Sequence, residues 1–198
     1  MDDALVVADV GVLGPTGWLT RNLSFSLRPG QVLAVVSAAS AAATRAVLAI
    51  GGAITPDEGV TETTRPPGVG WIPESGSPSP DQRLSDAMAE AAAGGSELRT
   101  KEGVNARLHQ VGLLEEADRR VAELDRSERV RLGLAMALVS QVGVVVLPEL
   151  DAGLPAPDRQ LLWNLVMSLA GTGIAVVVGC TEADPRASMV LDLWRESS

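Results

Sequence analysis

Continuous apolar runs and helical stripes alternate along this chain. Val32–Val36, Val144–Leu147 and Ile174–Val178 contain only apolar residues, which is typical of strands that are buried on both faces of a parallel sheet. Pro157–Ala170 repeats apolar residues at helical spacing and predicts an amphipathic helix. The stripe of this helix consists of Leu161, Leu162, Leu165, Val166 and Leu169. Strands that alternate with helices in this way predict an α/β fold.

Weaker patterns complete the prediction of a single domain over residues 1–198. Further strands are expected at Leu5–Ala8, Asn22–Leu27, Val69–Ile72 and Met189–Trp194, and a helix at Ala41–Ile50. Residues 28–30 and 55–59 are expected to turn, and residues 74–81 to form a loop. Helical stretches at about 83–93, 97–112 and 126–139 follow one another without a strand between them. We therefore expect residues 83–139 to form a helical subdomain inserted in the sheet.

Composition and charge narrow the classes of partner. Hydrophobic residues make up 46% of the chain, which argues against disorder. The net charge of −9 argues against nucleic acid or an anionic lipid surface as the main partner. A local cluster of arginines leaves two interpretations open, a solvated helix face and a basic patch. The cluster consists of Arg119, Arg120, Arg126, Arg129 and Arg131.

The chain is expected to be a cytoplasmic protein. Cys180 is its only cysteine, so no disulfide is predicted and a reducing compartment is the default. Met1–Asp3 is acidic, unlike a signal peptide, and no regulatory tail is expected after the last strand. No apolar run approaches the roughly 20 residues that a membrane helix needs, so direct membrane insertion is not expected.

Several motifs in a fixed order resemble one family. Residues 124–138, "LDRSERVRLGLAMAL", align without gaps to the pattern "LSGGERQRVALARAL" of the ATP-binding cassette (ABC) ATPases. The segments "LSFSLRPGQVLAVV", "ITPDEGV" and "VVVLPELDAGLPAPDRQLLWNLV" match other parts of that family in the same order. The resemblance runs from Leu5 to about Asp192. It implies a P-loop NTPase-like core with a mostly parallel sheet, an N-terminal antiparallel β portion and the inserted helical subdomain.

The phosphate-binding loop of that family, G-x-x-G-x-G-K-[ST]-[ST], falls on residues 37–45. Three glycines that turn the backbone amides inward are replaced by Ser37, Ser40 and Ala42. Ala43 replaces the lysine that reaches the phosphates. The only lysine of the chain, Lys101, lies in the helical insert. The resemblance therefore predicts a degenerate nucleotide pocket.

Two residues of the loop leave functional alternatives open. Thr44 keeps a hydroxyl group that could contact Mg²⁺. Arg45, near a helix N-terminus, could bind a phosphate in an altered pose. Alternatively, the loop is simply a strand-to-helix turn, rich in alanine because alanine favours helix.

Other site positions implied by the resemblance are also changed. Glu149 falls on the catalytic glutamate, but Pro148 replaces the aspartate that holds the metal shell. Glu74 replaces a glutamine, and Thr181 a switch histidine. Asp151 is displaced from the metal position by three residues. No metal ligand set is predicted. The only histidine, His109, lies in the helical insert, and Trp18 is the nearest aromatic candidate for stacking on adenine.

Members of this family work as head-to-tail pairs, in which each chain lends its signature motif to the ATP of the other. Here Asp125, Arg126 and Ser127 replace Ser-Gly-Gly. Asp125 places negative charge where a phosphate would approach, and Arg126 fills space that glycine leaves open. Both the pocket that the chain owns and the half-pocket that it lends are thus predicted to be altered.

Two hypotheses follow. The first is a catalytically inactive ABC-type subunit that acts in assembly, coupling or regulation, with no cofactor expected. Its partner would be an intact ABC ATPase chain or a membrane permease subunit, which would hold it at the inner face of the cell membrane. The second is a divergent ATPase that uses Thr44, Arg45, Glu74 and Glu149 with ATP and Mg²⁺. A homodimeric scaffold without a transporter is a third, weaker alternative.

Overall fold

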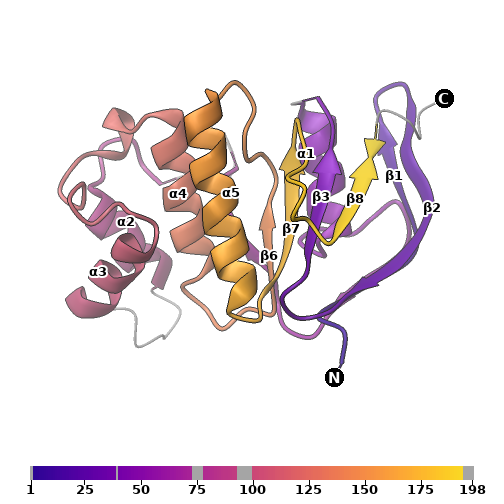
Figure 1. Cartoon of the computed structure of the whole chain (residues 1–198), viewed down its shortest axis with the longest axis horizontal. Helices are drawn as coiled ribbons and strands as arrows, with labels where there is room; N and C mark the ends of the chain where they lie inside the picture. The colour runs from indigo at the N-terminus through magenta and orange to yellow at the C-terminus, as the bar shows by residue number, and fades with distance from the viewer. Residues whose placement is uncertain (1, 39, 73–77, 93–99, 194–198) are drawn as a thin grey trace.

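The structure is a computed structural model that describes residues 2–38, 40–72, 78–92 and 100–193 (Figure 1). Its strands are β1 (Leu5–Gly14), β2 (Gly17–Leu27), β3 (Val32–Val36), β4 (Glu58–Thr63), β5 (Gly68–Val69), β6 (Val144–Leu147), β7 (Ala175–Cys180) and β8 (Met189–Asp192). Its helices are α1 (Ala41–Ile50), α2 (Leu84–Ala91), α3 (Lys101–Gln110), the 3-10 turn η3 (Val121–Glu123), α4 (Arg126–Ala137) and α5 (Ala156–Gly171).

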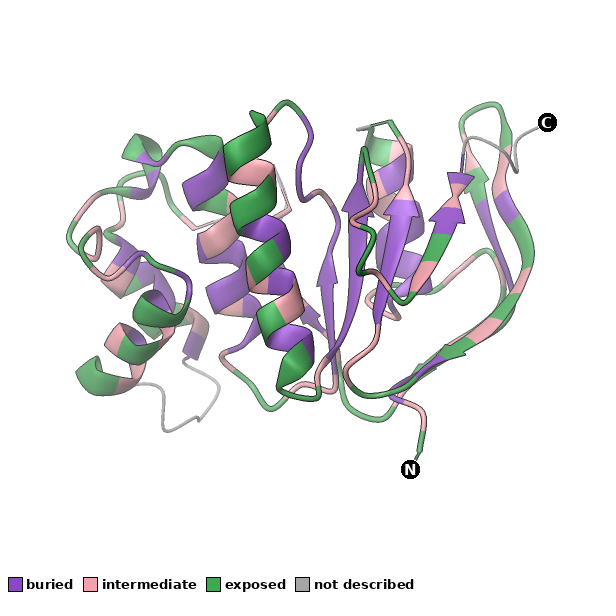
Figure 2. Cartoon of the chain, in the orientation of Figure 1, coloured by how far each residue is buried: buried purple, intermediate pink, exposed green. Residues whose placement is uncertain are grey.

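A parallel sheet with strand order β5-β6-β7-β3-β8 forms the centre of the described chain. The continuous apolar runs of the sequence became β3, β6 and β7, which are almost entirely buried (Figure 2). Alternate residues of a strand face opposite sides of a sheet. Accordingly, Leu33 and Val35 join one hydrophobic cluster, whereas Val32 and Ala34 join the other.

Helices cover both faces of this sheet. α1 packs in the cluster on one face, together with β1 and Leu27 of β2. α4 and α5 pack in the cluster on the other face, where Leu162, Val166 and Leu169 of the predicted stripe are buried. Leu161 of the same stripe is 43% exposed, because the buried face of α5 is narrower than the stripe.

An antiparallel sheet with order β2-β1-β4 lies beside α1 (Figure 1). The sequence did not predict β4, and its expected turn at residues 55–59 overlaps the strand, because β4 begins at Glu58. The reason is its polar sequence, EGVTET, which has no apolar run to reveal it. β1 and β2 are also longer than expected and form a hairpin.

The helices between β5 and β6 gather at one end of the molecule (Figure 1). α2, α3 and α4 lie within the predicted stretches 83–93, 97–112 and 126–139, and α4 begins at the predicted residue. β5 ends at Val69, whereas a strand was expected up to Ile72. Trp71 instead packs against Gly133 of α4, so closely that a Cβ at Gly133 would overlap the Trp71 backbone.

The predicted fold class is confirmed, with a mostly parallel core, an N-terminal antiparallel portion and helices inserted between β5 and β6. That residues 83–139 form a subdomain of their own stays a prediction. Within the residues that the structure describes, no helix has both the length and the apolar character needed to cross a bilayer.

Candidate functional site

The carboxyl ends of β3, β6 and β7 meet at one edge of the parallel sheet. Beyond β3, the Ser37 N–H donates to the Cys180 carbonyl at 3.0 Å. Beyond β6, the Leu150 N–H donates to the Gly179 carbonyl at 2.8 Å. Ligands of open α/β sheets bind at such an edge. It is therefore the first place to look for a site.

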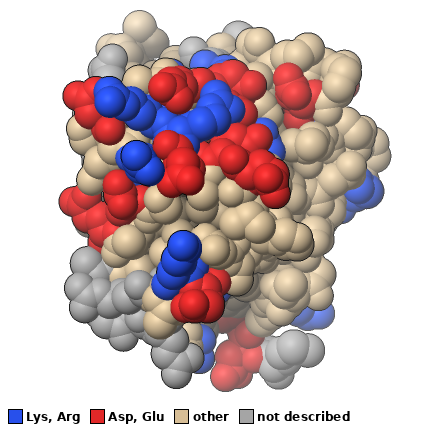
Figure 3. Space-filling model, turned by 90° about the vertical axis from the view of Figure 1, so that its left-hand side faces the viewer, with Lys and Arg blue, Asp and Glu red and all other residues tan. Residues whose placement is uncertain are grey.

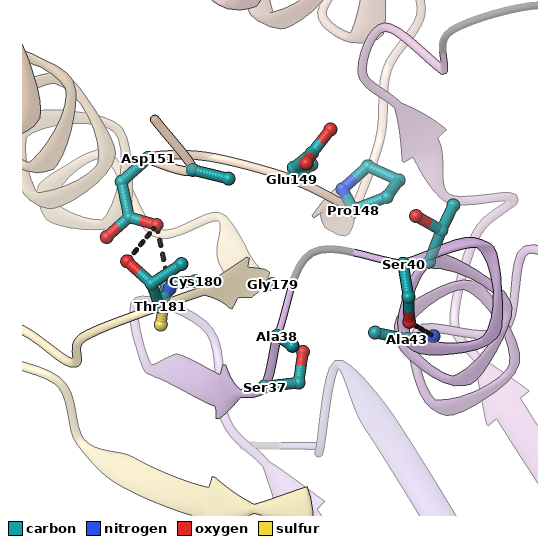
Figure 4. A pocket seen from close by; sticks show the side chains of 12 residues that line it. Ser37, Ala38, Ser40, Ala43, Pro148, Glu149, Asp151, Gly179, Cys180 and Thr181 are labelled. Carbon is teal, nitrogen blue, oxygen red and sulfur yellow. Dashed lines mark hydrogen bonds between the residues drawn. The ribbon is translucent and has the colours of Figure 1, made fainter. Parts of the chain in front are cut away.

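A small hollow lies between these strand ends (Figure 4). The space open to the centre of a water molecule is about 10 Å³, which is room for about one water. It is lined by Ser37, Ala38, Ser40, Ala43, Thr44, Pro148, Glu149, Asp151, Ala152, Gly179, Cys180 and Thr181.

The hollow brings together most of the predicted site residues. Ser37, Ser40, Ala43, Thr44 and Glu149 line it, whereas Ala42 and Arg45 do not. Glu74 lies outside the described residues.

The N-terminus of α1 is capped by its own chain. Ser40 precedes the helix in an extended conformation, and its hydroxyl oxygen accepts a hydrogen bond from the Ala43 N–H at 3.1 Å. This is the usual N-cap contact, which satisfies one of the free amides at a helix start. That amide is therefore engaged within the protein, and the Ala43 side chain beside it is a buried methyl group.

Arg45 contacts the antiparallel sheet rather than the hollow. Its guanidinium donates to both carboxylate oxygens of Asp57, at 2.6 and 2.9 Å, and to the Leu13 carbonyl at 3.2 Å. The Leu13 N–H also donates to Asp57 at 2.8 Å. The Arg45 guanidinium, followed by that N–H, lowers the pKa of Asp57 to about 2. Arg45 thus joins α1 to the β1–β2 hairpin in this structure.

Glu149 forms an ion pair within the chain. Its carboxylate lies 2.9 Å from the guanidinium of Arg126, the first residue of α4. Both side chains are partly exposed, at 23% and 47% respectively. The sequence singled out both residues separately, but nothing in their spacing showed that α4 begins beside the end of β6.

Asp151 was set aside in the sequence, yet it is the most buried charged residue of the site. It is 1% exposed, and its Oδ1 accepts hydrogen bonds from the Thr181 N–H at 2.7 Å and from the Thr181 hydroxyl at 3.1 Å (Figure 4). These bonds tie the segment after β6 to the end of β7. An aspartate close behind an all-apolar strand was the available signal, and its partner, 30 residues away, could not be read from the sequence.

Cys180 lines the hollow. It is 5% exposed, and burial raises the pKa of its thiol to about 12. The negative charges of Asp151 and Glu182 raise this pKa further. The thiol is therefore protonated at neutral pH and is a poor nucleophile.

A capping box closes the N-terminus of α4. The Asp125 carboxylate accepts from the Glu128 N–H at 2.8 Å, and the Glu128 carboxylate accepts from the Asp125 N–H at 2.9 Å. Arg119 adds an ion pair to Glu128 at 2.8 Å. A carboxylate of the chain itself therefore holds an amide at this helix start, where anions otherwise bind.

The arginine cluster of the sequence is engaged in contacts within the chain. Arg119, Arg120 and Arg126 pair with Glu128, Asp81 and Glu149. Arg129 and Arg131 donate to backbone carbonyls of Ala122 and Gly112. Figure 3, which views the helical end, shows basic side chains interleaved with acidic ones. This mixture favours the solvated helix face over a basic patch.

Trp18 and His109, the aromatic candidate and the only histidine, lie outside the hollow. Trp18 is in β2, with the Arg21 guanidinium 4.6 Å from its ring centre, and it does not line the hollow. His109 is in α3. Among the described residues, no group of three or more His, Cys, Asp or Glu side chains is arranged to hold a metal ion.

Comparisons with known proteins point to one kind of relative. No protein-family model matches the chain. It is 28% identical to the SkfA peptide export ATP-binding protein SkfE of Bacillus subtilis, over 80% of this chain and 70% of that protein. It is 27% identical to the Nod factor export ATP-binding protein I of Paraburkholderia xenovorans, over 79% of this chain. It is 26% identical to the zinc import ATP-binding protein ZnuC of Rhizobium johnstonii, over 85% of this chain. The chain spans 56% of the length of each of these last two relatives.

Solved structures share the fold. An ABC transporter assigned to the metal-chelate type, in an inward-facing conformation, has a chain with a TM-score of 0.77 and 19% identity over 97% of this chain and 80% of that chain. The ADP conformation of MJ1267, an ATP-binding cassette of an ABC transporter, has a TM-score of 0.68 and 18% identity, over 93% of this chain and 83% of that chain. The chain therefore has the ATP-binding cassette fold, and its sequence is similar to ATP-binding proteins that are named for import and for export.

Proposed function

We propose that this chain is an ATP-binding-cassette-type subunit that does not hydrolyse ATP and serves in the assembly, coupling or regulation of a membrane transporter or of a paired ATPase. The fold and the sequence similarities support the first half of this proposal. The local geometry of the hollow supports the second half.

The observation that carries the proposal is the start of α1. A triphosphate needs free backbone amides and a cation that offsets its charge. Here Ser40 holds the Ala43 N–H, Ala43 itself offers a methyl group, and Asp57 engages the guanidinium of Arg45. Among the described residues, no basic side chain lines the hollow, which has room for about one water. These features of the described residues support a pocket that does not hold ATP with Mg²⁺.

The acidic side of the hollow supports the same proposal. A metal-assisted hydrolysis needs a carboxylate for the metal shell and a second one for the attacking water. Pro148 has no carboxylate, Glu149 is paired with Arg126, and Asp151 accepts two hydrogen bonds from Thr181. None of these three residues is therefore placed to hold a metal ion or to activate a water molecule.

The comparisons favour a second candidate over the first, a divergent nucleotide-binding ATPase that powers transport through an unusual site. The relatives named above are all ATP-binding proteins by name. Ser37 and Thr44 also bring hydroxyl groups to the hollow. In this case the Arg126–Glu149 pair would have to open so that Glu149 could act as a base.

Titration with ATP and Mg²⁺ separates the two candidates. Binding at 100 times Kd would stabilise the fold by about 2.7 kcal/mol, which thermal unfolding resolves readily. We expect no shift of Tm at millimolar ATP and no turnover that Glu149→Gln abolishes. A saturable, Mg²⁺-dependent shift, or turnover lost in Glu149→Gln, would establish the second candidate instead.

Two lysine variants refine this test. Ala43→Lys introduces an ammonium group at the hollow, whereas Ala42→Lys places the same group on the same helix outside it. If the site lacks only the cation, Ala43→Lys alone should gain affinity for ATP. We expect neither variant to bind, because the Ser40 cap remains and Pro148 still supplies no carboxylate to a metal shell.

The partner is tested by isolating the chain from its native host. We expect a permease subunit or an intact ABC ATPase to co-purify, which would place the chain at the inner face of the membrane through that partner. Light scattering of the purified chain distinguishes this from a homodimeric scaffold. A stable dimer with no co-purifying protein would contradict the role in a transporter.

A further inference from the structure

A second cavity lies beside α5. It is about 200 Å³ in volume, enough for a small organic group, and it opens between the first half of α5 and the segment that follows β7. It is lined by Asp151, Ala156, Arg159, Gln160, Trp163, Glu182, Ala183, Asp184 and Pro185. Asp151 lines both this cavity and the hollow.

One oxygen of Asp151 lacks a donor. Oδ1 accepts both hydrogen bonds from Thr181, but Oδ2 is buried without a hydrogen-bond partner in the described part of the chain. Figure 4 shows this second oxygen pointing away from the Thr181 contacts. A buried carboxylate oxygen without a donor is unfavourable, so native proteins nearly always satisfy such groups. Asp151 lines this cavity, and a donor that approaches Oδ2 from there requires the side chain or the cavity wall to move.

The charges of the cavity wall determine which donor fits. Arg159 lies 3.5 Å from Glu182, and Arg186 pairs with Asp184 at 2.8 Å, so these charges offset one another. Asp151, by contrast, forms no ion pair with the residues that the structure describes, and its Oδ2 has no donor among them. Trp163, which is 4% exposed, contributes an apolar surface. A cation that carries N–H donors and a short apolar stem matches this wall, whereas an anion does not.

We propose that this cavity binds a primary ammonium group, which donates to Asp151 Oδ2. The group would be carried by a free small amine or by a lysine side chain of a partner protein. Because Oδ2 is shielded from bulk water, the wall must adjust to admit the ammonium. The weakest part of the wall is the Arg159–Glu182 pair, which is long and exposed at 35% and 77%, and pairs of this kind contribute little to stability. This proposal does not depend on whether the chain binds ATP.

The test uses n-butylammonium as the probe at neutral pH, where it is charged. The backbone amide of Thr181 bonds directly to Asp151, so its NMR resonance reports on the carboxylate. We expect a saturable shift of this resonance with n-butylammonium and none with 1-butanol, which has the same stem without the charge. A hydrogen bond between an ammonium group and a carboxylate is charge-assisted, and losing it should weaken the binding of the amine about tenfold or more.

Two matched variants test whether Asp151 binds the ammonium group. Asp151→Asn keeps an oxygen for Thr181 but places an amide donor at the second position, so it should bind n-butylammonium at least about tenfold more weakly. Asp158→Asn makes the same change near the start of α5 without lining the cavity, and it should bind like the natural protein. Thermal unfolding of both variants confirms that they are folded.

The outcomes separate the sources and can overturn the proposal. Nα-acetyl-lysine methylamide, a lysine with its backbone capped, binds alongside n-butylammonium if the cavity accepts a partner's lysine. Only the free amine binds if it does not. No saturable shift with n-butylammonium, or equal binding by Asp151→Asn, would overturn the proposal. Asp151 would then be a purely structural link to Thr181.

Discussion

Glu149 and Asp151 follow the same strand two residues apart, and the fold gives them different surroundings. Glu149 is partly exposed and meets Arg126 from α4. Asp151 is buried and meets Thr181 from the end of β7. Arg45 lies near a helix N-terminus, but its guanidinium is engaged in an ion pair with Asp57. At the scale of single residues, Arg45 and Glu149 are engaged in ion pairs within the chain, whereas Asp151 keeps one carboxylate oxygen without a hydrogen-bond partner among the described residues.

The pair of Asp57 and Arg45 predicts a pH dependence. The pKa of Asp57 is lowered from 3.8 to about 2 in the folded chain, so its contribution to stability is present above about pH 4. The contribution is lost as the pH falls from about 4 to 2, because the unfolded chain then binds the proton more tightly. We expect Asp57→Asn to be less stable than the natural protein at pH 6, with the difference shrinking towards pH 2.

Urea unfolding at several pH values measures this difference. Glu62→Gln, on the strand β4 that directly follows Asp57, is the control, since no ion pair of Glu62 is found among the described residues. A difference between Asp57→Asn and the natural protein that stays constant from pH 6 to pH 2 would show that the ion pair contributes nothing.

Cys180 predicts slow chemical labelling. Its thiol is buried and has a pKa of about 12, so the thiolate is rare at pH 8. We expect a disulfide reagent to label the native protein only as fast as the chain opens, and to label it immediately in denaturant. Since this is the only cysteine, the absorbance of the released thiol reports one site. Rapid stoichiometric labelling of the native protein would contradict the packing of the hollow.

At the scale of elements, α4 is the most constrained helix. The capping box of Asp125 and Glu128 fixes its start, and Arg126 joins that start to the end of β6. In its middle, Gly133 lets the chain at Trp71 approach closely. This helix matches the most specific motif of the sequence. Its cap, its ion pair and its close approach to Trp71 fix its position against the rest of the fold.

Gly133→Ala tests the close approach. The new Cβ would overlap the backbone of Trp71, which cannot move aside as a flexible side chain would. We expect a net destabilisation of about 1–3 kcal/mol by urea unfolding, despite the better helix propensity of alanine. Gly171→Ala near the end of α5, where a new Cβ meets nothing within 4 Å, should be neutral or slightly stabilising. Equal effects of the two substitutions would mean that α4 and Trp71 are not in contact.

At the scale of the whole molecule, the helical block and the parallel sheet share one hydrophobic cluster. Leu84 and Met88 of α2 and Leu108 of α3 belong to the same cluster as Val176 and Val178 of β7. α4 provides the link, since it packs against both the other helices and the sheet. A continuous core of this kind favours cooperative unfolding.

Calorimetry tests this cooperativity. We expect a single thermal transition whose calorimetric enthalpy equals its van't Hoff enthalpy. Two transitions would instead indicate that residues 83–139 unfold as a unit of their own. The second result would support the predicted inserted subdomain as an independent folding unit.

Much of the fold could be predicted from local pattern. β3, β6 and α5 were recognisable because buried strands and amphipathic helices leave apolar runs and stripes in the sequence. β4 could not be predicted, because its strand residues are mostly polar and it is defined by its pairing with β1. The candidate site was located by its loop residues, but Asp151 was not assigned to it, because its partner is distant in the chain.

The sequence by itself determined the buried strands, the helices and their order. It also determined the chemistry that the loop lacks, since a missing lysine or glycine is a property of the residues alone. Only the tertiary structure decided which charges meet. The contacts of Arg45 with Asp57, Arg126 with Glu149 and Asp151 with Thr181 join segments that are separated in the chain. Electrostatic contacts depend on distance and burial in space, and the sequence specifies neither until the sheet has brought its strand ends together.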